Sequence, residues 1–269
     1  MDFDYKGFTD THAHLSFIDE AQVSAELLPP ALAAGGFGFI LDIGTDGGDL
    51  SPRIAKLSAC PNVRFAVGVW PYKEQICRIE ENARILEREL DAAPAGLVVA
   101  IGECGYDLRE NPGAPAEETA FLEMQISLAQ KRGLPVIIHS REAAERTIET
   151  LRHFPGVRGI IHCFSYTREE ARIFLDMGWH ISFAGNLTFK NAQGIREACA
   201  FVPDERLLLE TDCPFLAPVP WRGKTCHPAM IAETYKQAAA LRGKSVEDIK
   251  TLISQNAAAL FGLPSNFRD

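Results

Sequence analysis

Two histidines near the start of the chain have a spacing that could bind a metal ion. His12 and His14 close an apolar segment, residues 7–14, and Asp10 precedes them at the same spacing. On a β-strand, alternate side chains point to one face, so these three side chains would share a face. Two imidazoles about 7 Å apart along a strand can converge on one ion. Polar residues that merely finish a strand have the same pattern, so this segment alone leaves both interpretations open.

Four later segments also end in side chains that bind metals. The apolar runs 96–103, 134–139 and 158–162 end in such a residue, and another follows the run 206–211. Together with His12 and His14 at the end of the first run, four of the seven histidines of the chain occupy the ends of apolar runs. Histidines scattered through a core would not be ordered in this way. The pattern predicts one metal site built from six residues, which are His12, His14, Glu103, His139, His162 and Asp212.

The composition of this donor set indicates the kind of metal and the chemistry. Four imidazoles are too many for calcium and suit zinc, manganese or a similar ion. Six donors exceed one tetrahedral shell, so we expect two divalent ions about 3.5–4 Å apart with one carboxylate between them. Zinc, manganese and magnesium all remain open. Such a pair lowers the pKa of a shared water to about 7 and binds an oxygen of a scissile phosphoryl or carbonyl group.

The elements that must position these residues alternate along the chain. Eight apolar runs, most of them without polar alternation, are typical of strands covered on both faces. Amphipathic segments at 118–132, 141–154, 167–177, 231–241 and 245–261 predict helices between and after them. An open doubly wound sheet also alternates in this way. Because the donors all follow the ends of runs, we expect instead a single α/β domain over residues 1–269, a parallel (β/α)8 TIM barrel. The eight runs are residues 7–14, 37–44, 63–69, 96–103, 134–139, 158–162, 179–183 and 206–211.

Composition limits the location and the partners. The chain has 269 residues, a net charge of -9 and seven scattered cysteines without a C-x-x-C spacing, which favours a reducing cytoplasm. No apolar stretch reaches the roughly 18 residues of a membrane span, and the acidic residues 1–4 do not resemble a signal peptide. The negative charge disfavours non-specific coating of DNA. Without an obvious exposed apolar stretch, we expect a monomer.

Several motifs together make the chain similar to a known family. They are TDTHAHL (9–15), AIGECGYD (100–107), LPVIIHSR (134–141), GIIHCFS (159–165) and LLETDCPFLAP (208–218). With these motifs the chain resembles the TatD family of metal-dependent hydrolases over nearly its whole length. The resemblance implies a (β/α)8 barrel and phosphodiester hydrolysis, typically 3′-to-5′ on DNA ends. It also implies that His12, His14, Glu103 and Asp212 bind a first ion, that Glu103 bridges to a second ion on His139 and His162, and that Asp212 is the general base.

Residues around the donors are candidates for contacts with substrate or with the ligands. Arg222 and Lys224, in the loop after the eighth run, resemble the family's phosphate contacts, and Arg141 follows the fifth run. We expect Asp10 to orient a metal-binding histidine. Asp107 could be a family residue or a solvated loop acid.

Two segments depart from the family pattern. Trp70 lies in GVWPY (68–72), where the family often has Gly-x-His-Pro-His, and Cys226 and His227 stand where Asn-Glu is usual. Trp70 could stack a nucleobase, with Tyr72 and Trp221, or simply fill space. His227 could be a substitute contact with substrate, but we expect it to be a surface residue. The missing histidines and the negative charge keep open a second function, hydrolysis of a small-molecule, acyl or amide substrate.

Overall fold

The computed structural model describes residues 5–18, 24, 28–112 and 115–263. The acidic residues 1–4 lie outside this range. Within it, eight parallel strands form one sheet whose neighbours follow chain order. The strands are β1 (Thr9–Ala13), β2 (Phe39–Ile43), β3 (Val63–Val67), β4 (Val98–Asp107), β5 (Val136–Arg141), β6 (Gly159–Ile161), β7 (His180–Phe183) and β8 (Leu207–Leu209).

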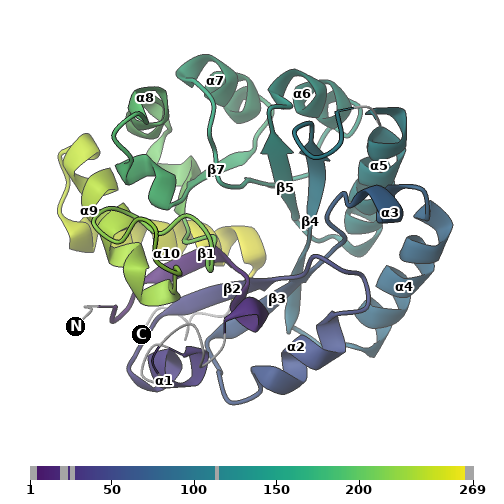
Figure 1. Ribbon diagram of the computed structural model, residues 1–269, viewed down its shortest axis with the longest axis horizontal. Coiled ribbons are helices and arrows are strands. Elements are labelled where there is room, and N and C mark those ends of the chain that lie inside the picture. The colour runs from purple at the N-terminus through teal and green to yellow at the C-terminus, as the bar shows by residue number, and fades with distance from the viewer. Residues whose placement is uncertain (1–4, 19–23, 25–27, 113–114, 264–269) are drawn as a thin grey trace.

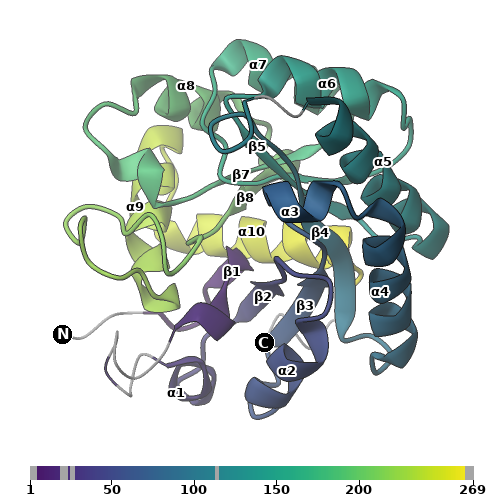
Figure 2. The ribbon, with the colours of Figure 1, turned by 45° about the vertical axis from the view of Figure 1, so that its right-hand side comes forward.

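Helices surround the sheet on its outside, as Figures 1 and 2 show. The α-helices are α1 (Pro29–Ala34), α2 (Leu50–Lys56), α3 (Lys73–Ile76), α4 (Ile79–Ala92), α5 (Pro115–Arg132), α6 (Ala144–Arg152), α7 (Arg168–Asp176), α8 (Gln193–Phe201), α9 (Ile231–Arg242) and α10 (Val246–Phe261). Short 3₁₀ segments are η1 (Leu15–Phe17), η3 (Gly185–Thr188), η4 (Asp204–Arg206) and η5 (Pro228–Met230). None of the described helices is long and apolar enough to cross a membrane.

The last strand returns to the first, which separates a barrel from an open sheet. The amide of Asp212 donates to the carbonyl of His12 at 2.9 Å, and the amide of His14 donates to the carbonyl of Cys213 at 2.8 Å. A doubly wound sheet would instead change its strand order partway. The predicted (β/α)8 barrel is therefore confirmed, and its β8–β1 seam includes three of the predicted metal donors, His12, His14 and Asp212.

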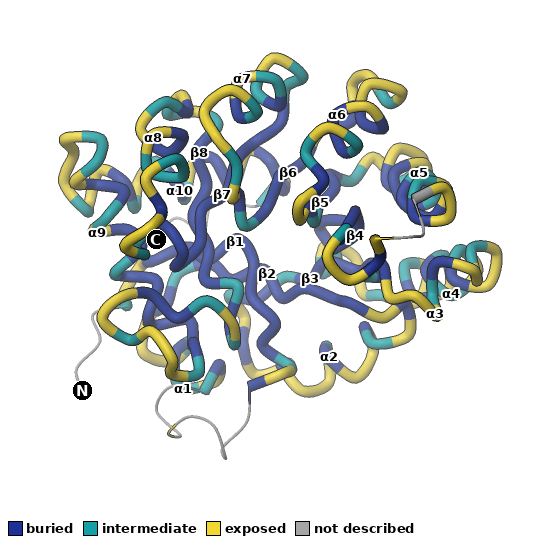
Figure 3. Tube along the Cα trace, turned by 45° about the horizontal axis from the view of Figure 1, so that its top comes forward, coloured by how far each residue is buried: buried dark blue, intermediate teal, exposed yellow. Residues whose placement is uncertain are grey.

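The sequence explains these elements through burial and capping. The strands are buried almost throughout, and the helices expose only their outer faces, as the colours of Figure 3 show. Ser245 caps α10, because its hydroxyl accepts from the amide of Asp248 at 3.0 Å while the Asp248 side chain accepts from the Ser245 amide. Gly262 ends that helix with φ 64°, a left-handed conformation that glycine adopts without strain.

Two strand ends differ from the apolar runs and shape the site. β4 continues past Glu103 to Asp107, because it keeps pairing with β5 after the apolar run ends. Its Gly105 is essential to that pairing, since a Cβ there would lie 1.8 Å from the carbonyl oxygen of His139. β1 ends at Ala13 rather than at His14, whose amide bonds across the β8–β1 seam. Polar side chains thus continue inside regular strands, which an apolar run cannot indicate.

Candidate metal centre

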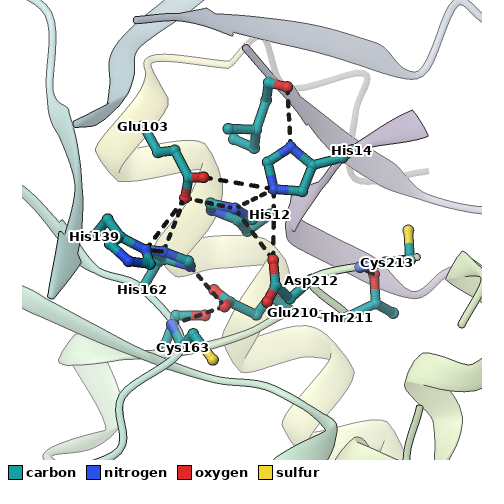
Figure 4. A network of polar contacts seen from close by, with 12 residues as sticks. His12, His14, Glu103, His139, His162, Cys163, Glu210, Thr211, Asp212 and Cys213 are labelled. Atoms are coloured by element: carbon teal, nitrogen blue, oxygen red, sulfur yellow. Dashed lines mark hydrogen bonds and ion pairs between the residues drawn. The ribbon is translucent and has the colours of Figure 1, made fainter. Parts of the chain in front are cut away.

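All six predicted donors meet at the carboxyl ends of the strands. His12, Glu103 and His139 lie within β1, β4 and β5. The other three follow the ends of β1, β6 and β8, and Figure 4 shows all six side chains pointing toward one another. The barrel thereby gathers donors from five separate parts of the chain, as the run ends predicted.

Glu103 is the centre of this group. Its Oε2 lies 2.9 Å from Nε2 of His162, 3.4 Å from Nε2 of His12 and 3.8 Å from Nδ1 of His139. Its other oxygen, Oε1, lies 3.8 Å from Nε2 of His14. In Figure 4 Glu103 stands between His14 on one side and His139 with His162 on the other. One carboxylate therefore faces both halves of the group.

Asp212 closes the group on the β8–β1 side. Its Oδ1 lies 3.6 Å from Nε2 of His12 and 3.5 Å from Nε2 of His14. The two histidine nitrogens are themselves 3.3 Å apart. Asp212 has φ 56°, in the left-handed region that non-glycine residues rarely adopt. This conformation turns the chain directly after β8, and strained backbone of this kind clusters at functional sites.

The outward nitrogens of three imidazoles contact acceptors. Nδ1 of His14 lies 3.3 Å from the carbonyl of Ile43, and Nε2 of His139 lies 3.1 Å from Oδ2 of Asp107. Nδ1 of His162 lies 3.3 Å from Oε1 of Glu210. In a neutral imidazole, these acceptors favour the proton on the nitrogen that faces them, so the opposite nitrogen of each ring would offer a lone pair to the centre.

Convergent lone pairs need a cation between them, and several observations fit one. Three groups of three donors have ligand atoms within 4.8 Å of one another, and Glu103 belongs to two of these groups. The buried Glu103 Oε2 has no hydrogen-bond partner among the described residues, although three histidine nitrogens surround it. The residues present therefore fit a bound divalent ion. The groups are His12–His14–Glu103, Glu103–His139–His162 and His12–His162–Asp212.

Glu103 and His162 shift each other's pKa in opposite directions. Burial opposes ionisation of Glu103, but the charge of His162 and the close contacts with the His12 and His162 rings hold the pKa of Glu103 well below its usual value. Burial likewise disfavours a charge on His162, yet the Glu103 carboxylate raises the pKa of His162 well above its usual value. The carboxylate is therefore ionised, and a metal ion competes with a proton for the His162 nitrogen.

Burial and neighbouring charges also shift the pKa values of His12, His14 and Asp212. Burial, reinforced by the charge of His162, lowers the pKa of His12. Burial also opposes a charge on His14, but a hydrogen bond with Asp212 and nearby carboxylates raise its pKa. Burial would raise the pKa of Asp212, whereas the contact with His14 and the histidine charges lower it. Asp212 is thus ionised at neutral pH and able to accept a proton.

Asp10 contacts the backbone rather than a histidine ring. Its carboxylate accepts from the amide of His12 at 3.2 Å, and from the amide and hydroxyl of Thr211 at 3.0 and 2.6 Å. Burial raises the pKa of Asp10 to about 8, against the effect of these hydrogen bonds. Asp10 therefore joins β1 to the segment after β8 and positions the donors beside it through the main chain.

A cavity of about 490 Å³ opens onto the donors. Arg141 and Trp70 line it, while Arg222 and Lys224 are exposed and do not. Arg222 instead lies over the ring of Phe189, 4.2 Å from its centroid. The structure thus brings two of the four predicted substrate contacts to the donors and leaves the other two outside the cavity.

The expectation for His227 is wrong. This residue is 2% exposed, and it does not line the cavity. It is the N-terminal cap residue of the short segment η5. Cys226 beside it is also buried. The loop after β8 folds back onto the barrel, a tertiary contact that its proline-rich sequence did not indicate.

Two carboxylates that act on the histidines were not selected from the sequence. Glu210 is buried and accepts from the amide of Cys163 at 2.8 Å, besides its contact with His162. Asp107, for which the sequence allows either a family residue or a solvated loop acid, lies against His139 in the structure. The available signal was position, since both acids stand within four residues of a predicted donor at a strand end.

Comparison with known proteins places this site in a family. The family model described as TatD related DNase matches residues 9–262. The metal-dependent hydrolase YcfH of Escherichia coli K12 is 34% identical over 261 residues, covering 96% of each chain. The 3′-5′ ssDNA/RNA exonuclease TatD of Erwinia amylovora is 36% identical over 203 residues, covering 73% of this chain and 77% of its own. The crystal structure of YJJV, a TatD homologue from Escherichia coli K12, superimposes with a TM-score of 0.85 at 28% identity, covering 97% of this chain and all of that one. The chain therefore belongs to the TatD family of metal-dependent hydrolases, as its motifs predicted.

Proposed function

We propose that this metal-dependent hydrolase is a two-ion phosphodiesterase that removes nucleotides from the 3′ end of single-stranded or frayed DNA. The observation that carries the proposal is the shared position of Glu103, whose carboxylate belongs to two groups of three donors. His12, His14 and Asp212 would hold one ion with Glu103. His139 and His162 would hold the second ion with the same carboxylate.

The residues divide the chemistry between binding and proton transfer. Divalent ions held by these donors would lower the pKa of a water molecule and supply positive charge at the scissile phosphate. Asp212 is ionised and lies at the edge of the donor group, so it takes the proton of the attacking water. Arg141 lines the same cavity 3.6 Å from Asp107 and offers its guanidinium to a non-bridging phosphate oxygen.

The choice of DNA ends draws on the relatives. One of them, from Erwinia amylovora, is named a 3′-5′ exonuclease of single-stranded DNA and RNA. The net charge of -9 is compatible with such a substrate only where local cations offset it, and bound metal ions would do so. Zinc, manganese and magnesium each suit part of the donor set, and we favour a transition ion because four donors are imidazoles.

End-labelled oligonucleotides test this proposal. Protein loaded with magnesium, manganese or zinc is incubated with single strands labelled at the 5′ or the 3′ end, and chelator-treated protein is the control. We expect stepwise shortening from the 3′ end that the chelator abolishes. No shortening with any of the three metals, where a control nuclease is active, would contradict the proposal.

A second candidate is a metal-dependent hydrolase of a small-molecule, acyl or amide substrate. The specific observation in its favour is Trp70, which lines the cavity where the family often has histidine, together with the net charge of -9. Turnover of carbonyl substrates without any cleavage of oligonucleotides would favour this candidate.

We further propose that the protein acts as a monomer in the cytoplasm. All seven cysteines are free in the structure, and six of them are fully or partly buried. Unpaired thiols are typical of a reducing compartment. Size-exclusion chromatography with light scattering tests the oligomeric state at micromolar concentrations.

A further inference from the structure

Large aromatic side chains are exposed at the mouth of the metal cavity. Among the described residues, the large hydrophobic side chains with high exposure are Phe17 at 42%, Tyr72 at 39%, Phe215 at 52% and Val219 at 45%. The three aromatic ones all line the metal cavity, whereas Val219 does not. Trp70 lines it as well. Exposed apolar area concentrated at a cavity marks a binding surface.

These four rings occupy one half of the mouth. Phe215 follows β8, Phe17 ends the short η1 segment after β1, and Trp70 and Tyr72 follow β3. Strands β8, β1, β2 and β3 are consecutive around the barrel, so we call the four residues the aromatic arc. The other half of the mouth, after β5, β6 and β7, is lined by polar side chains, among them Ser140, Arg141, Ser165 and Asn186.

The aromatic arc contacts the predicted metal ligands at both of its ends. The ring of Phe17 stacks on His14 with centroids 5.4 Å apart, and the ring of Phe215 meets the same imidazole edge-on at 6.0 Å. At the other end Trp70 lies 5.4 Å from His139 and 4.6 Å from Tyr72. A phosphodiester placed on the donors would therefore have its neighbouring bases within reach of these rings.

The Trp70 end of the arc is held in place by hydrogen bonds. Gln125 donates to the carbonyl of Val69 at 3.0 Å and accepts from the Val69 amide at 2.8 Å. The amide of Trp70 donates to the carbonyl of Thr45 at 3.0 Å, and Asn111 donates to the carbonyl of Pro71. Because the segment is already ordered, a ring stacked on Trp70 would cost little conformational entropy.

We propose that the aromatic arc stacks unpaired nucleobases on either side of the scissile phosphate, while the polar half of the mouth faces the sugar–phosphate backbone. This inference rests on the proposed phosphodiesterase function and defines its substrate as a single-stranded end. Bases inside a duplex already stack on their neighbours and offer no free face to a protein ring. A cavity of about 490 Å³ has the size of a small-ligand site and admits a splayed strand end.

An oligonucleotide with missing bases tests the inference separately from the function. Metal-loaded protein is given a single strand with a normal 3′ end, and the same strand with abasic residues at its last two positions. Stacking on an aromatic side chain changes affinity about tenfold per base. We expect a KM about a hundredfold higher for the strand that lacks two bases, with kcat nearly unchanged, because stacking binds substrate and transition state alike.

Variants of the aromatic arc test which of its residues cause the lower KM for the strand that keeps its bases. Trp70→Ala and Phe215→Ala should each raise KM about tenfold for the normal strand and have little effect on the abasic strand. Trp70→Phe keeps a ring and should restore most of the preference. Val219→Ala is the matched control, since Val219 is an exposed apolar residue outside the cavity.

Binding without turnover gives a second measurement. In Asp212→Asn protein, we expect binding of the normal strand to quench the fluorescence of Trp70, and this quenching to be absent when Trp70→Phe is added. The abasic strand should bind about a hundredfold less tightly in the same titration. Cleavage of both strands with equal KM, or an equal effect of Val219→Ala, would overturn the stacking inference and leave the phosphodiesterase intact. Failure to cleave either strand would refute the proposed function, and the inference with it.

Discussion

Glu210 offers a sharp test of how the metal centre is organised. Its side chain is completely buried, and its Oε1 accepts from the Cys163 amide at 2.8 Å and faces Nδ1 of His162 at 3.3 Å. The carboxylate thereby fixes the ring of His162 with Nε2 toward Glu103. We predict that Glu210→Gln weakens one of the two bound ions without emptying the site.

The size of the effect follows from the change of acceptor. Glutamine keeps a carbonyl that can accept both hydrogen bonds, but it removes the negative charge. A hydrogen bond to a charged group contributes about 1.5–3 kcal/mol, against about 0.5–1.5 kcal/mol for a neutral one. The loss for the His162 contact is therefore about 1–1.5 kcal/mol, which lowers the affinity of the ion on His162 about tenfold.

The measurement is a titration of metal-free protein with zinc or manganese in competition with a chromophoric chelator, which resolves two dissociation constants. We expect one constant to rise about tenfold in Glu210→Gln and the other to stay within a factor of two or so. Glu89→Gln is the matched control, because Glu89 is a buried acid on α4 that accepts from Ser51 at 3.2 Å. Two unchanged constants in Glu210→Gln, or the same rise in the control, would refute the positioning of His162 by Glu210.

Three further predictions concern single histidines and the proposed base. Asp212→Asn should keep the fold and at least one ion, measured by elemental analysis. Its turnover of oligonucleotides should fall by about 10²–10⁴-fold, and full activity would exclude Asp212 as the base. His139→Ala should lose one ion per chain, and wild-type stoichiometry by elemental analysis would contradict its role as a ligand. Burial, with a smaller effect of Arg206, lowers the pKa of His180 from 6.5 to about 4. Because the unfolded chain binds a proton that the folded one rejects, His180 should remove about 2 kcal/mol of stability between pH 7 and pH 5, and His180→Asn should abolish that share in urea unfolding at the two pH values.

The sequence alone determined the barrel and its donors for a simple physical reason. A strand buried on both faces needs a continuous apolar run, so eight such runs alternating with helices specify a parallel sheet. A polar residue at the end of such a run must lie at the carboxyl edge, and in a closed barrel all of those edges meet. His12, Glu103, His139 and His162 were therefore predictable as neighbours although up to 150 residues separate them.

Tertiary structure alone decided which groups act on those donors. Glu210 and Asp107 differ from solvated acids only in what they face. That depends on where the barrel places the end of β8 relative to the end of β6, and the end of β4 relative to β5. The same holds for His227, whose burial follows from the way a loop folds back onto the barrel. Side-chain periodicity encodes burial along one element, whereas contacts between elements depend on packing distances of a few ångströms that no local pattern carries. The aromatic arc is likewise a property of the closed barrel, since only closure brings Phe215 and Phe17 against the same imidazole, that of His14.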